Sequence, residues 1–92
     1  MALQILEENG TFQLHGSLTT TNTKSFIIHF EHIIKSMKDV TVNIDKVDVI
    51  DHNGVEALKA LMRLALHSNH IFSVIGNGCK EIYDDYKSSF AA

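Results

Sequence analysis

The 92-residue sequence predicts an α/β fold: a four-stranded, mixed but mostly parallel sheet with helices packed on it, in the order β-β-α-β-α-β-α. Three observations predict it. Segments in which apolar and polar residues alternate, the period of a half-buried strand, come between segments with the 3.6-residue period of a helix. Strands separated by helices of this length favour parallel pairing. A hairpin signal near the N-terminus adds one antiparallel strand.

The first two strands are predicted on either side of Asn9-Gly10 in "ALQILEENGTFQLHG". Leu3 and Ile5 alternate with polar residues before this dipeptide, and Phe12 and Leu14 do so after it. Asparagine and glycine tolerate the positive φ angles of a tight hairpin turn, so the two strands are expected to pair antiparallel.

The first helix is predicted after "SLTTTNTKSF", a stretch rich in helix-capping residues. Ile28 falls on the polar side of this helix and is expected to be a lone exposed apolar residue. The apolar residues on its other side are Phe26, Ile27, Phe30, Ile33, Ile34 and Met37.

The third strand is predicted over residues 39–45, "DVTVNID", and the second helix follows in "VDVIDHNGVEALKAL". More than half of this helix is apolar, so we expect it either to be covered from two sides or to keep apolar surface for a partner. Its central apolar stripe is Val55, Leu58, Leu61, Met62 and Ala65, and its narrow polar stripe is Glu56, Lys59, Arg63 and His67.

The last strand is predicted in "IFSVIG" and the last helix in "NGCKEIYDDYKSSF". Cys79, Ile82, Tyr86 and Phe90 recur at helical spacing, so the Cys79 thiol is expected to be buried. The single cysteine excludes an intrachain disulfide framework and suits a reducing cytoplasm.

The composition limits the classes of function. The net charge is −3, and no basic cluster interleaves with aromatic residues, so nucleic acid is not an expected partner. We expect no signal peptide in "MALQILEENG", and no membrane insertion, because the apolar runs are too short. The six histidines lack zinc-like spacing, so no metal site is expected. No cofactor and no catalytic group is expected either. We expect one cytoplasmic domain over residues 1–92.

The residues Asp51-His52-Asn53-Gly54 join the third strand to the second helix. Asn53 is a candidate N-cap with Glu56 at the third helical position, a variant of the capping box. Asp51 would add favourable charge near the helix dipole, and Gly54 would allow close approach of other backbone. The turn is either a well-made helix start or an exposed surface that a partner reads.

At this point the sequence resembles the STAS domain family, whose founding members are bacterial anti-sigma factor antagonists. The resemblance lies in residues 40–65, "VTVNIDKVDVIDHNGVEALKALMRLA", supported by "FQLHGSL" and "FSVIGNG". It implies a STAS-like fold and a non-enzymatic signalling module that regulates transcription. Such a module binds an anti-sigma factor, often an ATP-using serine kinase, and so releases a sigma factor. Phosphorylation of a serine or threonine in the turn abolishes that binding.

The sequence departs from the family pattern where the phospho-acceptor would lie, because that position is Asn53 and its neighbour is His52. A serine kinase can modify neither side chain, so the protein either binds constitutively or is regulated elsewhere. The threonines of "TTTNT" are the substitute candidates. The contact surface that the resemblance implies is Asp51, His52, Asn53 and Gly54 with the flank of the helix at Glu56, Lys59 and Arg63.

Two other roles stay open. The chain ends at Ala92 without the last strand and helix of longer family members, and short STAS subunits dock on the ATPase of a bacterial phospholipid-transport ABC complex. The resemblance therefore also allows an accessory subunit of such an ATPase. The third role, a small enzyme or ligand carrier, would use the threonine-rich loop.

Overall fold

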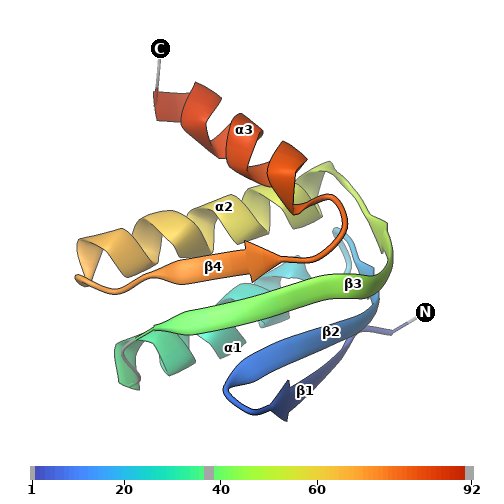
Figure 1. Ribbon diagram of the computed structural model, residues 1–92. Coiled ribbons are helices and arrows are strands. Elements are labelled where there is room, and N and C mark those ends of the chain that lie inside the picture. Colours follow the sequence, from blue (N-terminus) through green and yellow to red (C-terminus); the bar gives the residue numbers. More distant parts are fainter. Residues whose placement is uncertain (1, 37–38, 91–92) are drawn as a thin grey trace.

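The computed structural model describes residues 2–36 and 39–90, with the side chains of residues 89 and 90 excepted. The order of elements is the expected β-β-α-β-α-β-α (Figure 1). They are β1 (Gln4–Glu8), β2 (Thr11–Leu18), α1 (Thr23–Ser36), β3 (Val40–Ile50), α2 (His52–His67), β4 (Phe72–Ile75) and α3 (Cys79–Phe90). Met37 and the side chain of Phe90, which the sequence placed on apolar faces, lie outside the described residues.

The four strands form one sheet in the order β1-β2-β3-β4. β1 pairs antiparallel with β2, while β3 pairs parallel with both β2 and β4. The predicted fold class is confirmed. Because β2, β3 and β4 run in the same direction, the loops at their carboxyl ends lie along one edge of the sheet, on the right in Figure 1.

The predicted hairpin is confirmed in its turn residues and its pairing. Asn9 has φ 53° and Gly10 has φ 83°, the left-handed values that a two-residue hairpin turn requires. The turn pairs Glu8 with Thr11 and sets Ile5 opposite Leu14. The side chains facing the helices are therefore in register across the two strands.

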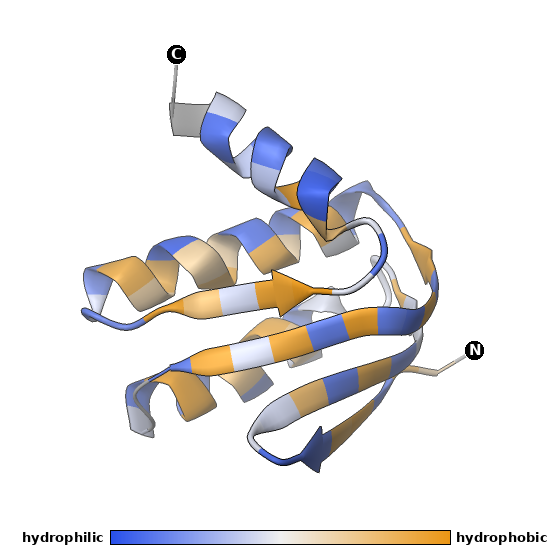
Figure 2. Ribbon diagram, in the orientation of Figure 1, coloured by the Kyte–Doolittle hydropathy of each residue, from blue (hydrophilic) through white to orange (hydrophobic). Residues whose placement is uncertain are grey.

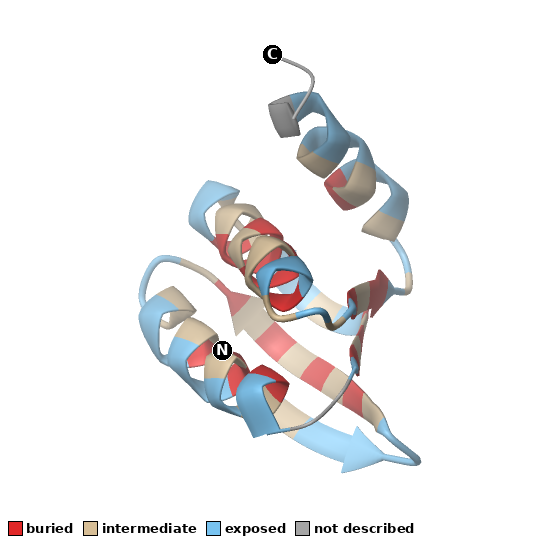
Figure 3. Ribbon diagram, turned by 90° about the vertical axis from the view of Figure 1, so that its left-hand side faces the viewer, coloured by how far each residue is buried: buried red, intermediate tan, exposed pale blue. Residues whose placement is uncertain are grey.

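α1 and α2 pack on the same face of the sheet, and the core lies between the two layers (Figures 1 and 3). Polar and apolar residues alternate along β2 and β3 (Figure 2). Phe12, Leu14 and Leu18 of β2 are buried beneath the helices. Within the described residues no helix covers the opposite face, where β2 carries half-buried polar side chains such as Gln13 and His15. This division explains the alternation seen in the sequence.

Phe30 of α1 is the centre of the aromatic core. Its ring centroid lies 5.3 Å from that of Phe12, 5.0 Å from that of Phe26 and 5.9 Å from that of Phe72. Two of these contacts are edge-to-face, the geometry that aromatic pairs favour. Phe30 therefore ties the first helix to strands β2 and β4. Ile28, on the outer side of α1, is 57% exposed, as the helical wheel predicted.

β3 is longer than the predicted strand 39–45, because it runs from Val40 to Ile50. Alternation of burial ends after Ile44, so periodicity alone placed the end of the strand too early. The parallel ladder with β2 continues through two register irregularities until Leu18 pairs with Ile50. Backbone pairing with β2 runs along this second half of the strand, in which Val47 and Ile50 alone pack against the core, and the strand leads directly into the start of α2.

α2 is covered from two sides, by α1 and by α3, and it also keeps some apolar surface, since Leu66 is 56% exposed. Ala57, Leu58, Leu61 and Ala65 are buried between these layers. α3 packs on α2 mainly through Ile82, which is 5% exposed. Cys79 was expected to be buried; it is half-buried and packs against the core.

Candidate functional site

The N-cap of α2 is Asp51, not Asn53 as the sequence predicted. Asp51 has extended backbone angles, and its Oδ1 accepts a hydrogen bond of 2.8 Å from the amide N–H of Gly54. The helix begins at His52, so Asn53 already lies in its first turn. An aspartate and an asparagine are about equally good N-caps, and the end of β3 at Ile50 decided between them.

Asp51 also binds the loop between β2 and α1. Its Oδ2 accepts hydrogen bonds from the amide N–H of Thr20 (2.9 Å) and from the Thr20 hydroxyl (3.0 Å). Asn53 Nδ2 donates to the same hydroxyl oxygen at 2.8 Å. The backbone adds a bond from the N–H of Asp51 to the carbonyl of Leu18. Together these contacts, here called the Asp51 clamp, fasten the start of α2 to the loop after β2.

Thr20 belongs to "TTTNT", which was expected to cap α1 or to hold a substitute phosphorylation site, but its contact with Asp51 was not predicted. The predicted topology could have indicated this contact between the two loops. Parallel strands place their carboxyl ends on one edge of the sheet, so the loops after neighbouring strands β2 and β3 must meet. The consequence is that a threonine hydroxyl lies directly against Asn53, the position where the family resemblance places a phospho-acceptor.

Gly54 is buried, and the space beside it is filled by the chain itself. A Cβ built on Gly54 would lie 2.8 Å from Cγ1 of Ile50 and closer still to the carbonyl oxygen of Leu18. The close approach expected at this glycine is therefore made by β2 and not by a partner. Gly54 is therefore not part of the contact surface, contrary to expectation, but lies buried beneath it.

Lys59 was expected on an exposed flank of α2, and this is wrong. Its side chain is only 6% exposed, and its Nζ lies 2.8 Å from Oε2 of Glu56 and 2.7 Å from Oδ2 of Asp85. α3 covers the lysine, and Asp85 supplies a carboxylate from that helix. A lysine is seldom buried unless it is paired, and here two carboxylates pair it. Lys59 thus fixes α3 on α2 and is not available to a partner.

The other expected contact residues keep accessible surface. His52 and Asn53 are exposed at the tip of the turn, and Asp51, Glu56 and Arg63 are half-buried. The guanidinium carbon of Arg63 lies 6.0 Å from the ring centroid of Tyr86, so this side chain also contacts α3. Asp51, His52, Asn53 and Glu56 lie at the start of α2, where the Asp51 clamp holds the turn in place, whereas Arg63 lies about three turns further along the helix.

The carboxylates of the site are stabilised in their charged form. The backbone N–H groups of Thr20 and Gly54 hold the pKa of Asp51 below its ordinary value. Hydrogen bonds from Lys59 lower the pKa of Glu56 and that of Asp85, and the bond to Asp85 is the main cause of the raised pKa of Lys59.

These shifts predict that the protein loses stability in acid. A carboxylate whose pKa is lower in the folded chain stabilises the fold above its unfolded pKa, ordinarily 3.8 for Asp and 4.5 for Glu. That contribution disappears as the pH falls through the lower folded values. Urea unfolding at pH 7, 5, 4 and 3 should therefore show nearly constant stability down to pH 5 and a steep fall below about pH 4. Asp51→Asn should flatten this fall, and equal stability at pH 5 and pH 3 would contradict the assignment.

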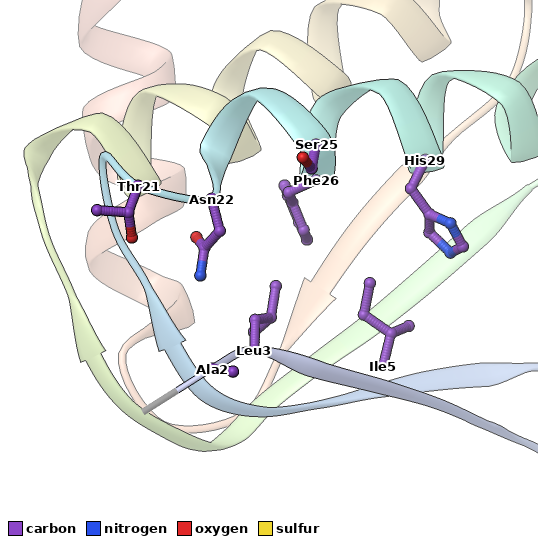
Figure 4. Close-up of a pocket in the computed structure, with 8 residues that line it drawn as sticks. All are labelled: Ala2, Leu3, Ile5, Thr21, Asn22, Ser25, Phe26 and His29. Carbon is purple, nitrogen blue, oxygen red and sulfur yellow. The ribbon is translucent and has the colours of Figure 1, made fainter.

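A cleft of about 610 Å³ opens beside the same loop, between α1 and the edge strand β1 (Figure 4). Leu3, just before β1, and Ile5 of β1 point toward α1, while Phe26, Ser25 and His29 line the helix side. Thr21 and Asn22 close the end nearest the loop. The threonine-rich loop therefore contributes to two sites. Thr20 belongs to the Asp51 clamp, and Thr21 and Asn22 line the cleft.

Two further findings concern metal and membrane sites. Among residues 2–36 and 39–90, no three histidine, cysteine, aspartate or glutamate side chains come together as metal ligands. In the same described ranges, no helix has the length and apolar character needed to span a membrane.

Several solved structures have the same fold at low sequence identity. The chain superposes on the Bacillus cell fate determinant SpoIIAA in its phosphorylated form with a TM-score of 0.68 and 15% identity, covering 96% of this chain and 83% of that one. An antisigma-factor antagonist STAS domain from Rhodobacter sphaeroides gives a TM-score of 0.62 at 13% identity, covering 82% of this chain and 85% of that one. The protein therefore has a STAS-like fold.

A larger protein contains the same fold as a part. Mglu matches with a TM-score of 0.64 and 17% identity over 82% of this chain, but the chain spans only 19% of the length of Mglu. No family model and no curated protein sequence matches the chain.

Proposed function

We propose that this STAS-like domain is a regulatory protein-interaction module of the anti-sigma factor antagonist type. It binds an anti-sigma factor in a bacterial cytoplasm, and thereby controls the release of a sigma factor. The STAS domain from Rhodobacter sphaeroides, which shares the fold, is itself an antisigma-factor antagonist. The module acts by binding and performs no chemistry of its own.

The observation that carries the proposal is the geometry of the turn before α2. His52 and Asn53 are exposed at its tip, while the Asp51 clamp and the buried Gly54 hold the backbone beneath them. A rigid, exposed turn loses little conformational entropy on binding, which favours its use as a contact surface. Asp51, Glu56 and Arg63 complete that surface, and Lys59 supports it from below through α3.

Asn53 makes this contact surface independent of a serine kinase. Its amide keeps a hydrogen bond to Thr20 without offering a hydroxyl for phosphate transfer. A phosphate would bring about −1.5 to −2 charges to the turn, close to the carboxylate of Asp51. The protein therefore stays in its binding form, unless another hydroxyl takes over the regulation, and Thr20 is the exposed hydroxyl that touches Asn53.

Asn53→Asp tests the contact surface. The new carboxylate faces that of Asp51 and presents charge to the partner, so we expect partner affinity to fall at least about tenfold, or 1.4 kcal/mol. Isothermal titration with the anti-sigma factor recovered by pull-down measures the loss, and circular dichroism checks that the variant is folded. Lys24→Ala, an exposed change on α1, is the control and should leave the affinity unchanged. Unchanged affinity of Asn53→Asp would show that the turn is not the contact.

Asn53→Ser tests the regulatory claim. If the partner is a serine kinase, the variant should take up phosphate from ATP on the hydroxyl introduced at position 53, whereas the wild type should gain none at this position. Mass spectrometry of the digested proteins locates the modification. Phosphate on Thr20 of the wild type would show that the regulatory site has moved within the clamp, and a Thr20→Val variant would then lose it.

A pull-down followed by mass spectrometry separates the proposed partner from the alternative. An anti-sigma factor supports the proposal, whereas the ATPase of a phospholipid-transport ABC complex would make the chain an accessory subunit of that ATPase. Recovery of neither class would argue against both roles and would direct attention to the cleft between α1 and β1 as a ligand site.

A further inference from the structure

A second, smaller crevice lies between α2 and α3, next to the proposed contact surface. It measures about 280 Å³ and opens where the chain leaves β4 and enters α3. Its lining is apolar except at the mouth. The aliphatic residues are Ile44 and Ile50 of β3, Val55 of α2 and Ile82 of α3, and the charged ones are Glu81 and Asp85 of α3.

The size and the depth of the crevice suit a single side chain. Pockets for drug-sized ligands occupy about 300–1,000 Å³, so this one lies just below that range. Ile44 and Ile82 are buried at its base, while Val55 and Ile50 are half-buried. Protein interfaces commonly depend on a few apolar or aromatic anchors inserted into pockets of this kind. The crevice therefore has the form of an anchor site.

The mouth of the crevice is acidic. Both charged residues that line it, Glu81 and Asp85, are carboxylates. Lys59 pairs with both Asp85 and Glu56 from its buried position. The side chains of these two carboxylates still remain 53% and 42% exposed, respectively. The nearby Lys80 pairs with Asp84 on the other flank of α3. One side of α3 thus presents negative charge beside the apolar part of the crevice.

We propose that the crevice receives an aliphatic side chain from a basic segment of the partner, with a lysine or arginine on each side of that residue. The basic groups meet Glu81 and Asp85 at the mouth and Glu56 beside it, and the aliphatic group packs on Val55 and Ile82. Val55 lies between Asn53 and Glu56 in the sequence, so the crevice is continuous with the contact surface of the proposed function, on which this inference rests.

Short synthetic peptides test the crevice without the natural partner. The probe is a twelve-residue peptide, about three turns long if helical, with one leucine between lysines. Two control peptides replace the leucine by alanine or the lysines by glutamate. In titrations of ¹⁵N-labelled protein, the lysine–leucine peptide should shift the amide signals of Val55, Gly78 and Ile82. The alanine peptide should bind at least about fivefold more weakly, and the glutamate peptide should not bind. Equal binding of the alanine peptide, or shifts centred on other residues, would overturn the proposal.

Two variants with the same charge change localise the acidic contact. Glu81→Lys should weaken the lysine–leucine peptide at least about fivefold, whereas Glu8→Lys, exposed at the far end of β1, should not alter its affinity. Val55→Thr keeps the size of the side chain but adds a hydroxyl, and should also weaken the peptide. Equal effects of Glu81→Lys and Glu8→Lys would show nonspecific attraction and reject the site. These readouts use no anti-sigma factor, so they can fail while Asn53→Asp still weakens partner binding. The reverse also holds.

Discussion

Replacing Gly54 with alanine should destabilise the protein by about 2–3 kcal/mol, the cost of overpacking a tightly packed site. The added methyl would overlap the carbonyl oxygen of Leu18 and lie 2.8 Å from Cγ1 of Ile50. The carbonyl belongs to the backbone of β2, so it cannot turn aside as a flexible side chain could. Relief requires the first turn of α2 to move away from the sheet, which would also lengthen the bonds of the Asp51 clamp.

The sign of this effect separates tertiary packing from helix propensity. Alanine in place of a helical glycine normally stabilises a protein by about 0.5–1 kcal/mol, so propensity alone predicts a gain. We expect instead a fall in Tm of about 8–20 °C by differential scanning calorimetry. The matched control is His52→Ala, two residues earlier and exposed, which should change stability by less than about 0.5 kcal/mol. A rise in the Tm of Gly54→Ala would refute the close approach.

Phe30→Ala should have the larger effect, a loss of about 3–5 kcal/mol. The ring is fully buried and contacts Phe12, Phe26 and Phe72, so its removal leaves a cavity where α1 meets the sheet. A domain of this kind has about 5–15 kcal/mol of stability in total, so the variant would lose a large part of that stability.

Chemical denaturation checks this expectation against a neighbour on the same helix. Ile28 is 57% exposed, so Ile28→Ala should lower the free energy of unfolding by no more than about 0.5 kcal/mol. Similar losses in the two variants would show that Phe30 is not the centre of the core.

The fold could be predicted from the sequence because residues close together in the chain indicate each of its elements. Asn9-Gly10 encodes the hairpin in two residues, and the spacing of Phe26, Phe30 and Ile34 encodes the buried face of α1. The end of β3 could not be read in the same way, since residues 45–50 are held by pairing with β2 while most of their side chains face outward. Periodicity reports a regular alternation of burial, and a segment in which only Val47 and Ile50 are half-buried gives no such pattern.

In the turn before α2, the structure changes two of the roles that the sequence predicted. Asp51, expected to supply charge, is the cap, and Asn53, expected to be the cap, is exposed and bonds to Thr20. Both side chains can cap a helix, and only the position where β3 ends assigns the role.

The sequence by itself determined the order of the elements, the hairpin turn and the buried faces of the helices, because each depends on residues within a few positions of one another. The tertiary structure decided what Thr20, Lys59 and Asp85 do. Thr20 meets Asp51 across 31 residues, and Lys59 meets Asp85 across 26. No local pattern records contacts over such separations, because they arise only when parallel strands bring their loops to one edge and α3 folds back over α2.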